Sequence, residues 1–146
     1  MATPYHELTD LQRSGVTEAQ LVQLTNEDDT ATTVDVDVYE AVRAEADAEV
    51  DGYIGARYAL PLETNPAIIR RLSVDVTVYR LFARKFQEGV PAQVASGYTR
   101  ACKVLQDLAA GNVTLGVQPV AAINTERAAK IVAGDRTFSR DSLKGF

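Results

Sequence analysis

The sequence predicts a mainly α-helical fold: a small bundle of about four to five helices over residues 1–111, followed by an extended arm over residues 112–146. Apolar residues recur at the spacing of a helix face through three long segments before residue 111. Clusters of Gly, Pro, Asn and Asp separate those segments. Because no long periodicity follows Gly111, we expect an arm there and no further bundle helix.

Two short helices are expected before the first long one. In LTDLQRSG, Thr9 is suited to cap a helix and Gly15 to end it. In VTEAQLVQLTN, Thr17 and Gln20 have the spacing of a capping box, and two leucines behind them are spaced to share a face. The polar stretch NEDDTATT then predicts a loop.

The first long helix is predicted over residues 35–58. Its apolar positions follow helical spacing, and acidic residues fill many of the others. Asp35 and Asp37 lie at the end where the helix dipole favours negative charge. Gly52 and Gly55 fall near the other end, where glycine permits close packing or termination, and the prolines of ALPLETNP then turn the chain.

The segment PAIIRRLSVDVTVYRLFARKF predicts the central helix, because it is apolar on most sides. Pro66 suits its first turn. The β-branched run would also fit a strand, but the length of the segment favours a helix. Asp75 interrupts the apolar pattern, so we expect it to face the interior or a partner and to be paired, with Arg57 or Arg71 as the candidate cation.

The last bundle helix is predicted in AQVASGYTRACKVLQDLAAG, whose apolar residues form one helical stripe and whose Gly111 suits a C-terminal stop. Cys102 lies beside that stripe, where we expect a small core residue. The residues after Gly111 contain small apolar clusters that can pair as a strand or lie across another surface. Within them, ERAAKIV can form one or two helical turns.

The net charge of −5 is divided unevenly along the chain. Residues 1–60 contain thirteen acidic residues and three arginines, whereas residues 61–146 contain seven acidic and twelve basic residues. Solvated helix faces account for such a division without any function, and an interaction surface is the alternative. The central-helix cations are better explained by pairing with the acidic half than by nucleic-acid binding, which requires a stronger basic excess.

Composition argues against membrane insertion and secretion. No apolar run approaches the ~18 residues of a membrane helix. The first residues lack the basic and apolar regions of a secretory signal. Cys102 is the single cysteine, so no internal disulfide or cysteine-based zinc site is expected, and a reducing compartment is the simplest location.

The motifs predict no enzyme, metal site or cofactor. His6 is the single histidine and falls near a terminus that we expect to be mobile. NEDDTATTVDVD begins like a calcium loop, but Ala31 stands where the sharp turn needs glycine and Asp37 where a bidentate glutamate is usual. Nucleotide-binding motifs and local nucleophile–base arrangements are absent from the sequence.

Five stretches carry a resemblance to a known family: LVQLTNED, AEVDGYIGARYALPL, NPAIIRRLSVDVTVYRL, LQDLAAGNVTLG and FSRDSLKGF. Together they span most of the chain. Their order resembles the small head–tail proteins of Mu-like phages and prophages, which look like head–tail connector proteins of the adaptor or head-completion kind. DGYIGARYALPL and FSRDSLKGF are the most specific of these stretches.

The resemblance implies a helical core of connector type and a structural role in the virion, without catalytic residues. It implies a ring of about twelve copies on the portal protein at the capsid vertex, with a tail stopper or neck protein on the other side. DNA would pass through the ring without sequence-specific binding. The protein would be made in the host bacterial cytoplasm and act at the virion neck, with no membrane involved.

The residues that make these contacts are inferred from physical chemistry and not from the family. An acidic lining lets DNA pass without adhering, and opposite charges can pair between neighbouring copies. The candidate acidic face of the channel or subunit contact consists of Glu45, Asp47, Glu49 and Asp51. The candidate basic residues for subunit contacts are Arg70, Arg71, Arg80, Arg84 and Lys85.

A partner-binding arm is expected at RTFSRDSLKGF. Its large apolar side chains are too few to form a core, and each can supply roughly 1.5–3 kcal/mol when a partner buries it. The arm residues are Arg136, Phe138, Arg140, Leu143, Lys144 and Phe146. A frayed terminus is the alternative interpretation.

Two other functions are alternatives to the connector. One is a small interaction or assembly-regulating module that forms no ring. The other is a carboxylate-based hydrolase, which needs a deep pocket with convergent acids of perturbed pKa.

Overall fold

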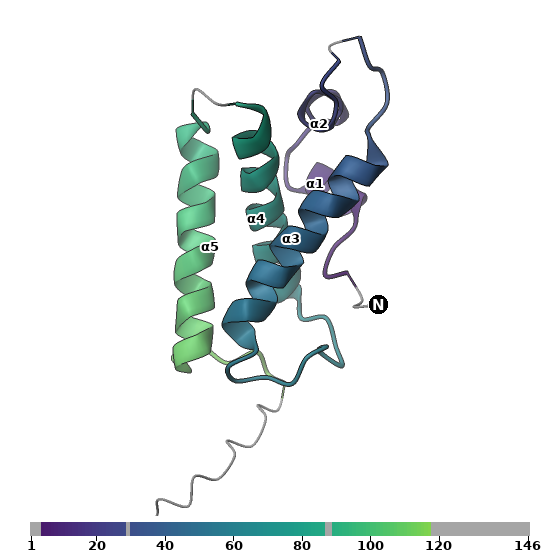
Figure 1. The fold of residues 1–146 in the computed structure, drawn as a ribbon. Coiled ribbons are helices and arrows are strands. Elements are labelled where there is room, and N and C mark those ends of the chain that lie inside the picture. The colour runs from purple at the N-terminus through teal and green to yellow at the C-terminus, as the bar shows by residue number, and fades with distance from the viewer. Residues whose placement is uncertain (1–3, 29, 87–88, 118–146) are drawn as a thin grey trace, which may run out of the picture.

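The computed structural model describes residues 4–28, 30–86 and 89–117, and this part of the chain contains five α-helices and no strand (Figure 1). The helices are α1 (Leu8–Arg13), α2 (Glu18–Thr25), α3 (Val36–Ile54), α4 (Ala67–Lys85) and α5 (Ala92–Ala110). The prediction of a mainly α-helical small bundle is therefore confirmed. None of the described helices is both long and apolar enough to cross a membrane.

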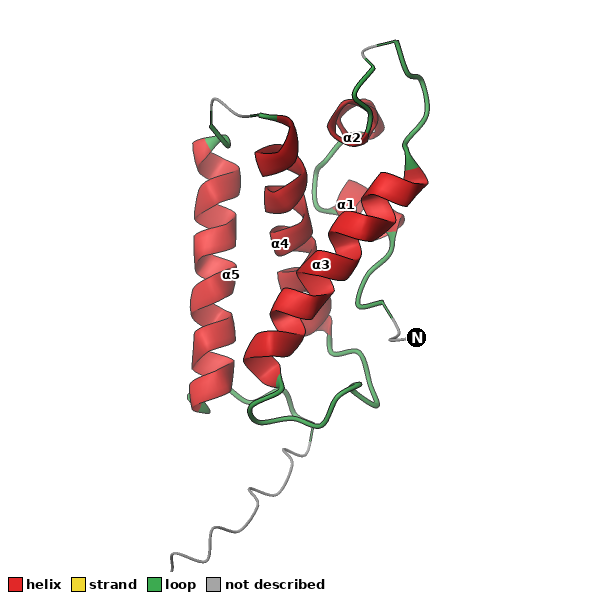
Figure 2. Ribbon diagram, viewed as in Figure 1, coloured by secondary structure: helices red, strands yellow, loops and turns green. Residues whose placement is uncertain are grey.

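The central helix is α4, as the sequence predicts. It contacts each of the other four helices, and α3, α4 and α5 also contact one another. Helix α5 runs alongside α4, α3 crosses them at an angle, and the short helices α1 and α2 lie at the side away from α5 (Figure 2). The three long helices thus form the body of the bundle, and α1 and α2 cover one side of it.

Two apolar clusters form the core, and α4 contributes to both. Ile69, Leu72 and Val76 of α4 pack with residues of α3 and α5, whereas Val74 and Leu81 pack with residues of α1, α2 and α3. Apolar residues therefore lie on more than one side of α4, as the sequence predicts for the central helix. Its β-branched run is helical because it has apolar neighbours on most sides, and packing outweighs the modest propensity penalty.

The helix ends follow local capping chemistry, with one wrong prediction. Thr17 accepts from the N–H of Gln20 at 3.3 Å, and the Gln20 side chain accepts from the N–H of Thr17 at 3.0 Å, so the expected capping box is confirmed. Thr9 is not the cap of α1: the helix begins earlier, at the N-cap Glu7. There the N–H of Glu7 donates to Asp10 at 3.0 Å, which gives the first turn an acidic partner that Thr9 cannot provide.

Helices α3 and α4 begin and end close to the predicted positions. Asp35 is the N-cap of α3 and its carboxylate accepts from the N–H of Val38 at 3.1 Å. The helix ends at Ile54, four residues before the predicted end, and Gly55 is its C-cap. Pro66 is the N-cap of α4 and not a residue of its first turn.

The end of α5 is fixed by a glycine, as predicted. Gly111 has φ +85°, a left-handed conformation that glycine adopts without strain. A Cβ at this position would lie 1.6 Å from an Nη atom of Arg57, so the guanidinium fills the place of a side chain. Gly111 therefore serves both the helix end and the packing of the loop after α3.

The first residues of the predicted arm pack on the bundle. Leu115 is buried in the larger cluster, and its N–H donates to the hydroxyl of Tyr58 at 3.2 Å. Residues 118–146, with the six predicted arm residues from Arg136 to Phe146, lie outside the described part of the chain. The partner-binding role of the arm stays a prediction.

Candidate interaction surfaces

The four predicted acids of α3 lie on two sides of the helix. Residues four apart share a helical face, whereas residues two apart point in different directions. Glu45 and Glu49 therefore face Arg80 of α4, and Glu49 also faces Tyr98 of α5. Asp47 and Asp51 both accept from Tyr5 of the N-terminal segment, and Asp47 also accepts from Ser73 of α4. Glu45 keeps 65% of its side chain exposed, but the side chains of Asp47 and Glu49 keep only 15% and 16%.

Arg80 joins the acids of α3 to α4. Its guanidinium donates to Glu49 at 2.8 and 3.2 Å and to Glu45 at 3.0 Å. The hydrogen bond to Glu49 raises the pKa of Arg80. The hydroxyl of Tyr98 on α5 donates to the other oxygen of Glu49 at 2.8 Å, which raises the pKa of this phenol. Glu49 thus ties the three long helices together.

An aromatic pair lies next to this network. The rings of Tyr79 and Tyr98 stack with centroids 4.1 Å apart and planes 9° apart. The pair lines a groove whose other residues come from α3 and α4, among them Val38, Ala41 and Ala83. These contacts help to fix the position of Tyr98, whose hydroxyl bonds to Glu49, so the network is held by packing as well as by charge.

The remaining predicted cations have partners within the chain or lie on its surface. Arg84 donates to Glu27 at 3.3 Å, and Lys85 donates to the carbonyl of Asn26 at 2.9 Å, so both hold the end of α2. Arg71 pairs with Asp75 at 3.2 Å one helical turn away. This choice settles the predicted partner of Asp75, which sits at the edge of the core with 25% of its side chain exposed. Arg70 is exposed on the same helix.

The N-terminal segment is anchored by polar side chains whose contacts the sequence does not predict. His6 is 2% exposed, so the expectation of a mobile position is wrong. Its Nδ1 lies 2.9 Å from the hydroxyl of Ser73, and that hydroxyl donates to Asp47 at 2.5 Å. The N–H of Tyr5 donates to Asp47 at 3.3 Å, and the hydroxyl of Tyr5 donates to Asp51.

This His6–Ser73–Asp47 chain holds structure and is not arranged for nucleophilic attack. Ser73 is fully buried, so a substrate cannot reach its oxygen. Its hydroxyl already donates a hydrogen bond to Asp47. Since the hydroxyl proton points to Asp47, Nδ1 of His6 donates to Ser73 and Nε2 carries the lone pair. Burial lowers the pKa of His6 to about 4, and burial raises the pKa of Asp47.

An acidic groove lies between α3 and the loop of residues 55–66. Glu40, Asp47 and Asp51 line one wall and Glu63 lines the other, with Ala44 and Leu62 among its apolar lining residues. Asn65 donates to the carbonyl of Tyr5 at 2.6 Å, which holds the loop against the N-terminal segment. The groove therefore combines negative charge with an apolar surface on a fixed backbone.

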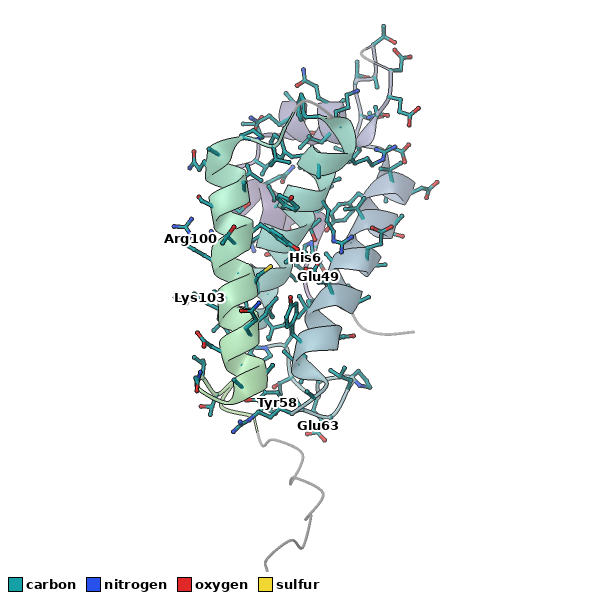
Figure 3. The ribbon with its side chains drawn as sticks, turned by 60° about the vertical axis from the view of Figure 1, so that its left-hand side comes forward. His6, Glu49, Tyr58, Glu63, Arg100 and Lys103 are labelled. Atoms are coloured by element: carbon teal, nitrogen blue, oxygen red, sulfur yellow. The ribbon has the colours of Figure 1, made fainter. Side chains whose placement is uncertain are left out.

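The outer face of α5 carries positive charge. Arg100 and Lys103 are exposed and lie on the side of α5 that points away from α3 (Figure 3). Large exposed apolar side chains lie elsewhere: Leu60 is 40% exposed beside the acidic groove, and Phe86 is 45% exposed at the end of α4. No group of three or more His, Cys, Asp or Glu side chains suited to a metal ion occurs among the described residues.

Comparison with known proteins shows which family and which relative this chain is similar to. A family model described as Bacteriophage Mu, Gp36 matches residues 5–133. The chain is also similar to the Mu-like prophage FluMu protein gp36 of Haemophilus influenzae, with 28% identity over 110 residues that cover 75% of this chain and 74% of that protein. Four of the five stretches that carry the resemblance lie within the matched residues, whereas FSRDSLKGF lies beyond residue 133.

Proposed function

The chain belongs to the bacteriophage Mu Gp36 family, and from this premise we propose that it is a structural virion protein that forms a ring between the portal at the capsid vertex and the tail. The family match over residues 5–133 carries the proposal. In this role the protein is a head–tail connector of the adaptor or head-completion kind, located at the virion neck. Its partners are the portal, neighbouring copies of itself and a tail stopper or neck protein.

The surface charges support contacts between neighbouring copies. Exposed acids such as Glu40 and Glu45 lie on α3, whereas Arg100 and Lys103 lie on the outer face of α5. When an acidic patch and a basic patch occupy different sides of one molecule, copies can bind head to tail, and a suitable rotation closes them into a ring. A ring of about twelve copies would match the symmetry that we expect of the portal.

The acids of α3 enter the proposal in different ways. Asp47, Glu49 and Asp51 already hold other parts of the same chain, so they contribute negative potential but are not free to pair with a neighbour. Glu45 is exposed and can face the DNA channel or an adjacent copy while it keeps Arg80. A negative lining repels phosphate, which lets packaged DNA pass without sequence-specific binding.

Electron microscopy of portal-bearing capsids tests the proposal. Capsids that lack the protein are mixed with purified protein, and the portal vertex is imaged before and after addition. We expect an added ring of density on the portal, with the tail stopper or neck protein binding only after the ring is present. Capsids without a portal serve as the control and should gain no density.

A vertex that gains no density would contradict the connector function. If the protein alters capsid or tail assembly in the same mixture without remaining on the vertex, an assembly-regulating module would explain the result. The two outcomes are distinguished by sedimenting the capsids and measuring how much protein stays with them.

A further inference from the structure

The acidic groove has a composition suited to a peptide that is both basic and aromatic. Four carboxylates line it, from Glu40, Asp47, Asp51 and Glu63, against the single cation of Arg43. Glu40 and Glu63 are exposed, and no hydrogen bond or ion pair holds their side chains in the described structure. They can therefore pair with an incoming cation without giving up a contact of the fold.

The same groove offers apolar surface. Ala44 and Ala48 form part of one wall, and Pro61 and Leu62 form part of the other. Leu60, at 40% exposure, is next to this surface on the same loop. Burial of an aromatic side chain against such surface removes apolar area from water on both partners, and this is a larger source of affinity than exposed charge pairs.

The chain itself contains a segment with matching chemistry. Residues 136–146 carry three basic residues against the single acid Asp141, together with two phenylalanines and a leucine. The groove has a single cation in its lining against four acids, so it does not repel a basic segment. The segment and the groove are therefore complementary in charge and in apolar character.

The start of the undescribed part of the chain lies near the groove. The N–H of Leu115 donates a hydrogen bond to the hydroxyl of Tyr58, and Tyr58 belongs to the loop that forms one wall of the groove. From Val117 to Arg136 the chain advances nineteen residues, which span at most roughly 65 Å, whereas a helix of the bundle is about 28 Å long. The segment can thus reach the groove of its own chain, at an effective concentration on the order of millimolar.

We propose that the acidic groove between α3 and the loop of residues 55–66 is the docking site for residues 136–146 of the same chain. Arg136, Arg140 and Lys144 pair with Glu40 and Glu63, and the phenylalanines cover Ala44 and Leu62. The proposal does not require ring formation. It gives the free protein a bound position for the arm, from which a partner with a stronger acidic or apolar surface can take it.

Paramagnetic NMR on the full chain tests the docking. A nitroxide is attached at Gly145→Cys in a Cys102→Ser background, and amide signals are compared with the spin label oxidised and reduced. The signals of Ala44, Ala48 and Leu62 should lose most of their intensity, whereas those on the outer face of α5 should not. Because exposed charges are screened at high salt, the loss should diminish as salt rises from about 0.1 M to 1 M.

Charge reversal and mixing supply the controls. Glu40→Lys with Glu63→Lys should abolish the attenuation, and Glu18→Lys with Asp37→Lys, which reverses the same number of exposed acids away from the groove, should retain it. Attenuation that survives reversal in the groove, or that is absent at Ala44, Ala48 and Leu62, overturns the proposal. If attenuation arises only between spin-labelled and isotope-labelled copies in a mixture, the occupant is a second copy, and the same-chain assignment is wrong.

Discussion

The buried His6 should make the fold sensitive to mild acid. The imidazole is 2% exposed, and Nε2 has no hydrogen-bond partner among the described residues. Burial, with a smaller effect of the Arg43 charge, lowers its pKa from 6.5 to about 4, while Asp10 acts weakly in the opposite direction. Asp47 lies 3.9 Å from Nδ1, and its nearer oxygen already accepts from Ser73.

The sign of the effect follows from the lowered pKa. The unfolded chain binds the His6 proton near pH 6.5, whereas the folded chain resists it until about pH 4. Stability from this residue is therefore complete above the unfolded pKa and is lost as the pH falls through the interval between the two values. At about 1.4 kcal/mol for each tenfold change in proton affinity, the full loss is about 3 kcal/mol, and roughly 2 kcal/mol of it appears between pH 7 and pH 5.

Urea unfolding at pH 7, 6 and 5 measures this loss when the wild-type chain is compared with His6→Asn. The asparagine amide can donate to Ser73 from nearly the same place as Nδ1, and it does not titrate in this range. The comparison is needed because Asp47 acts oppositely: burial raises its pKa, so its protonation favours the folded state as the pH falls. We expect the wild type to lose about 2 kcal/mol more than the variant. Equal pH dependence of the two chains would refute the reasoning.

Four further substitutions test the packing. Arg80→Ala removes a cation from the half-buried Glu49 and should lower the free energy of unfolding in urea by about 1–3 kcal/mol. Arg84→Ala removes a more exposed ion pair and should lower the same free energy by only about 0–1 kcal/mol. Gly111→Ala introduces a Cβ at a left-handed position that Arg57 occupies, so its melting temperature should fall, and an unchanged value would contradict the assigned cap. Leu105→Ala, at a fully buried core position, should destabilise by about 2–5 kcal/mol with unchanged helical circular dichroism at low temperature.

The parts of the fold that the sequence predicted are those set by local patterns. Helical periodicity identified the three long helices, because a segment such as α4 has apolar positions that repeat along its own length. The Arg71–Asp75 pair is also local, since the two residues are one helical turn apart. The prediction of Thr9 as a cap is wrong because Glu7, two residues earlier, is a competing N-cap whose partner is Asp10.

The contacts that the sequence could not supply join residues far apart in the chain. His6 and Ser73 are separated by sixty-seven positions. Nothing in the first ten residues indicates that the imidazole of His6 contacts a buried hydroxyl. Pairing of the acidic half with the basic half was expected in general terms, but the choice of Glu49 as the residue that binds both Arg80 and Tyr98 depends on the crossing of α3 over α4 and α5. Tertiary geometry, and not residue type, selects it.

Three of the four predicted α3 acids hold the fold together, so they cannot be changed to test the proposed channel lining. Reversal of all four charges would remove Asp47 from Ser73 and Glu49 from Arg80, so a loss of function would report a damaged bundle and not a changed channel. Glu45 differs because it is 65% exposed, and Arg80 keeps Glu49 when Glu45 is changed. A charge reversal confined to Glu45 therefore separates channel electrostatics from the stability of the fold, with DNA exit from assembled particles as the readout. Slower DNA exit with unchanged urea unfolding supports an acidic lining of the channel. Normal DNA exit shows that Glu45 is not part of that lining.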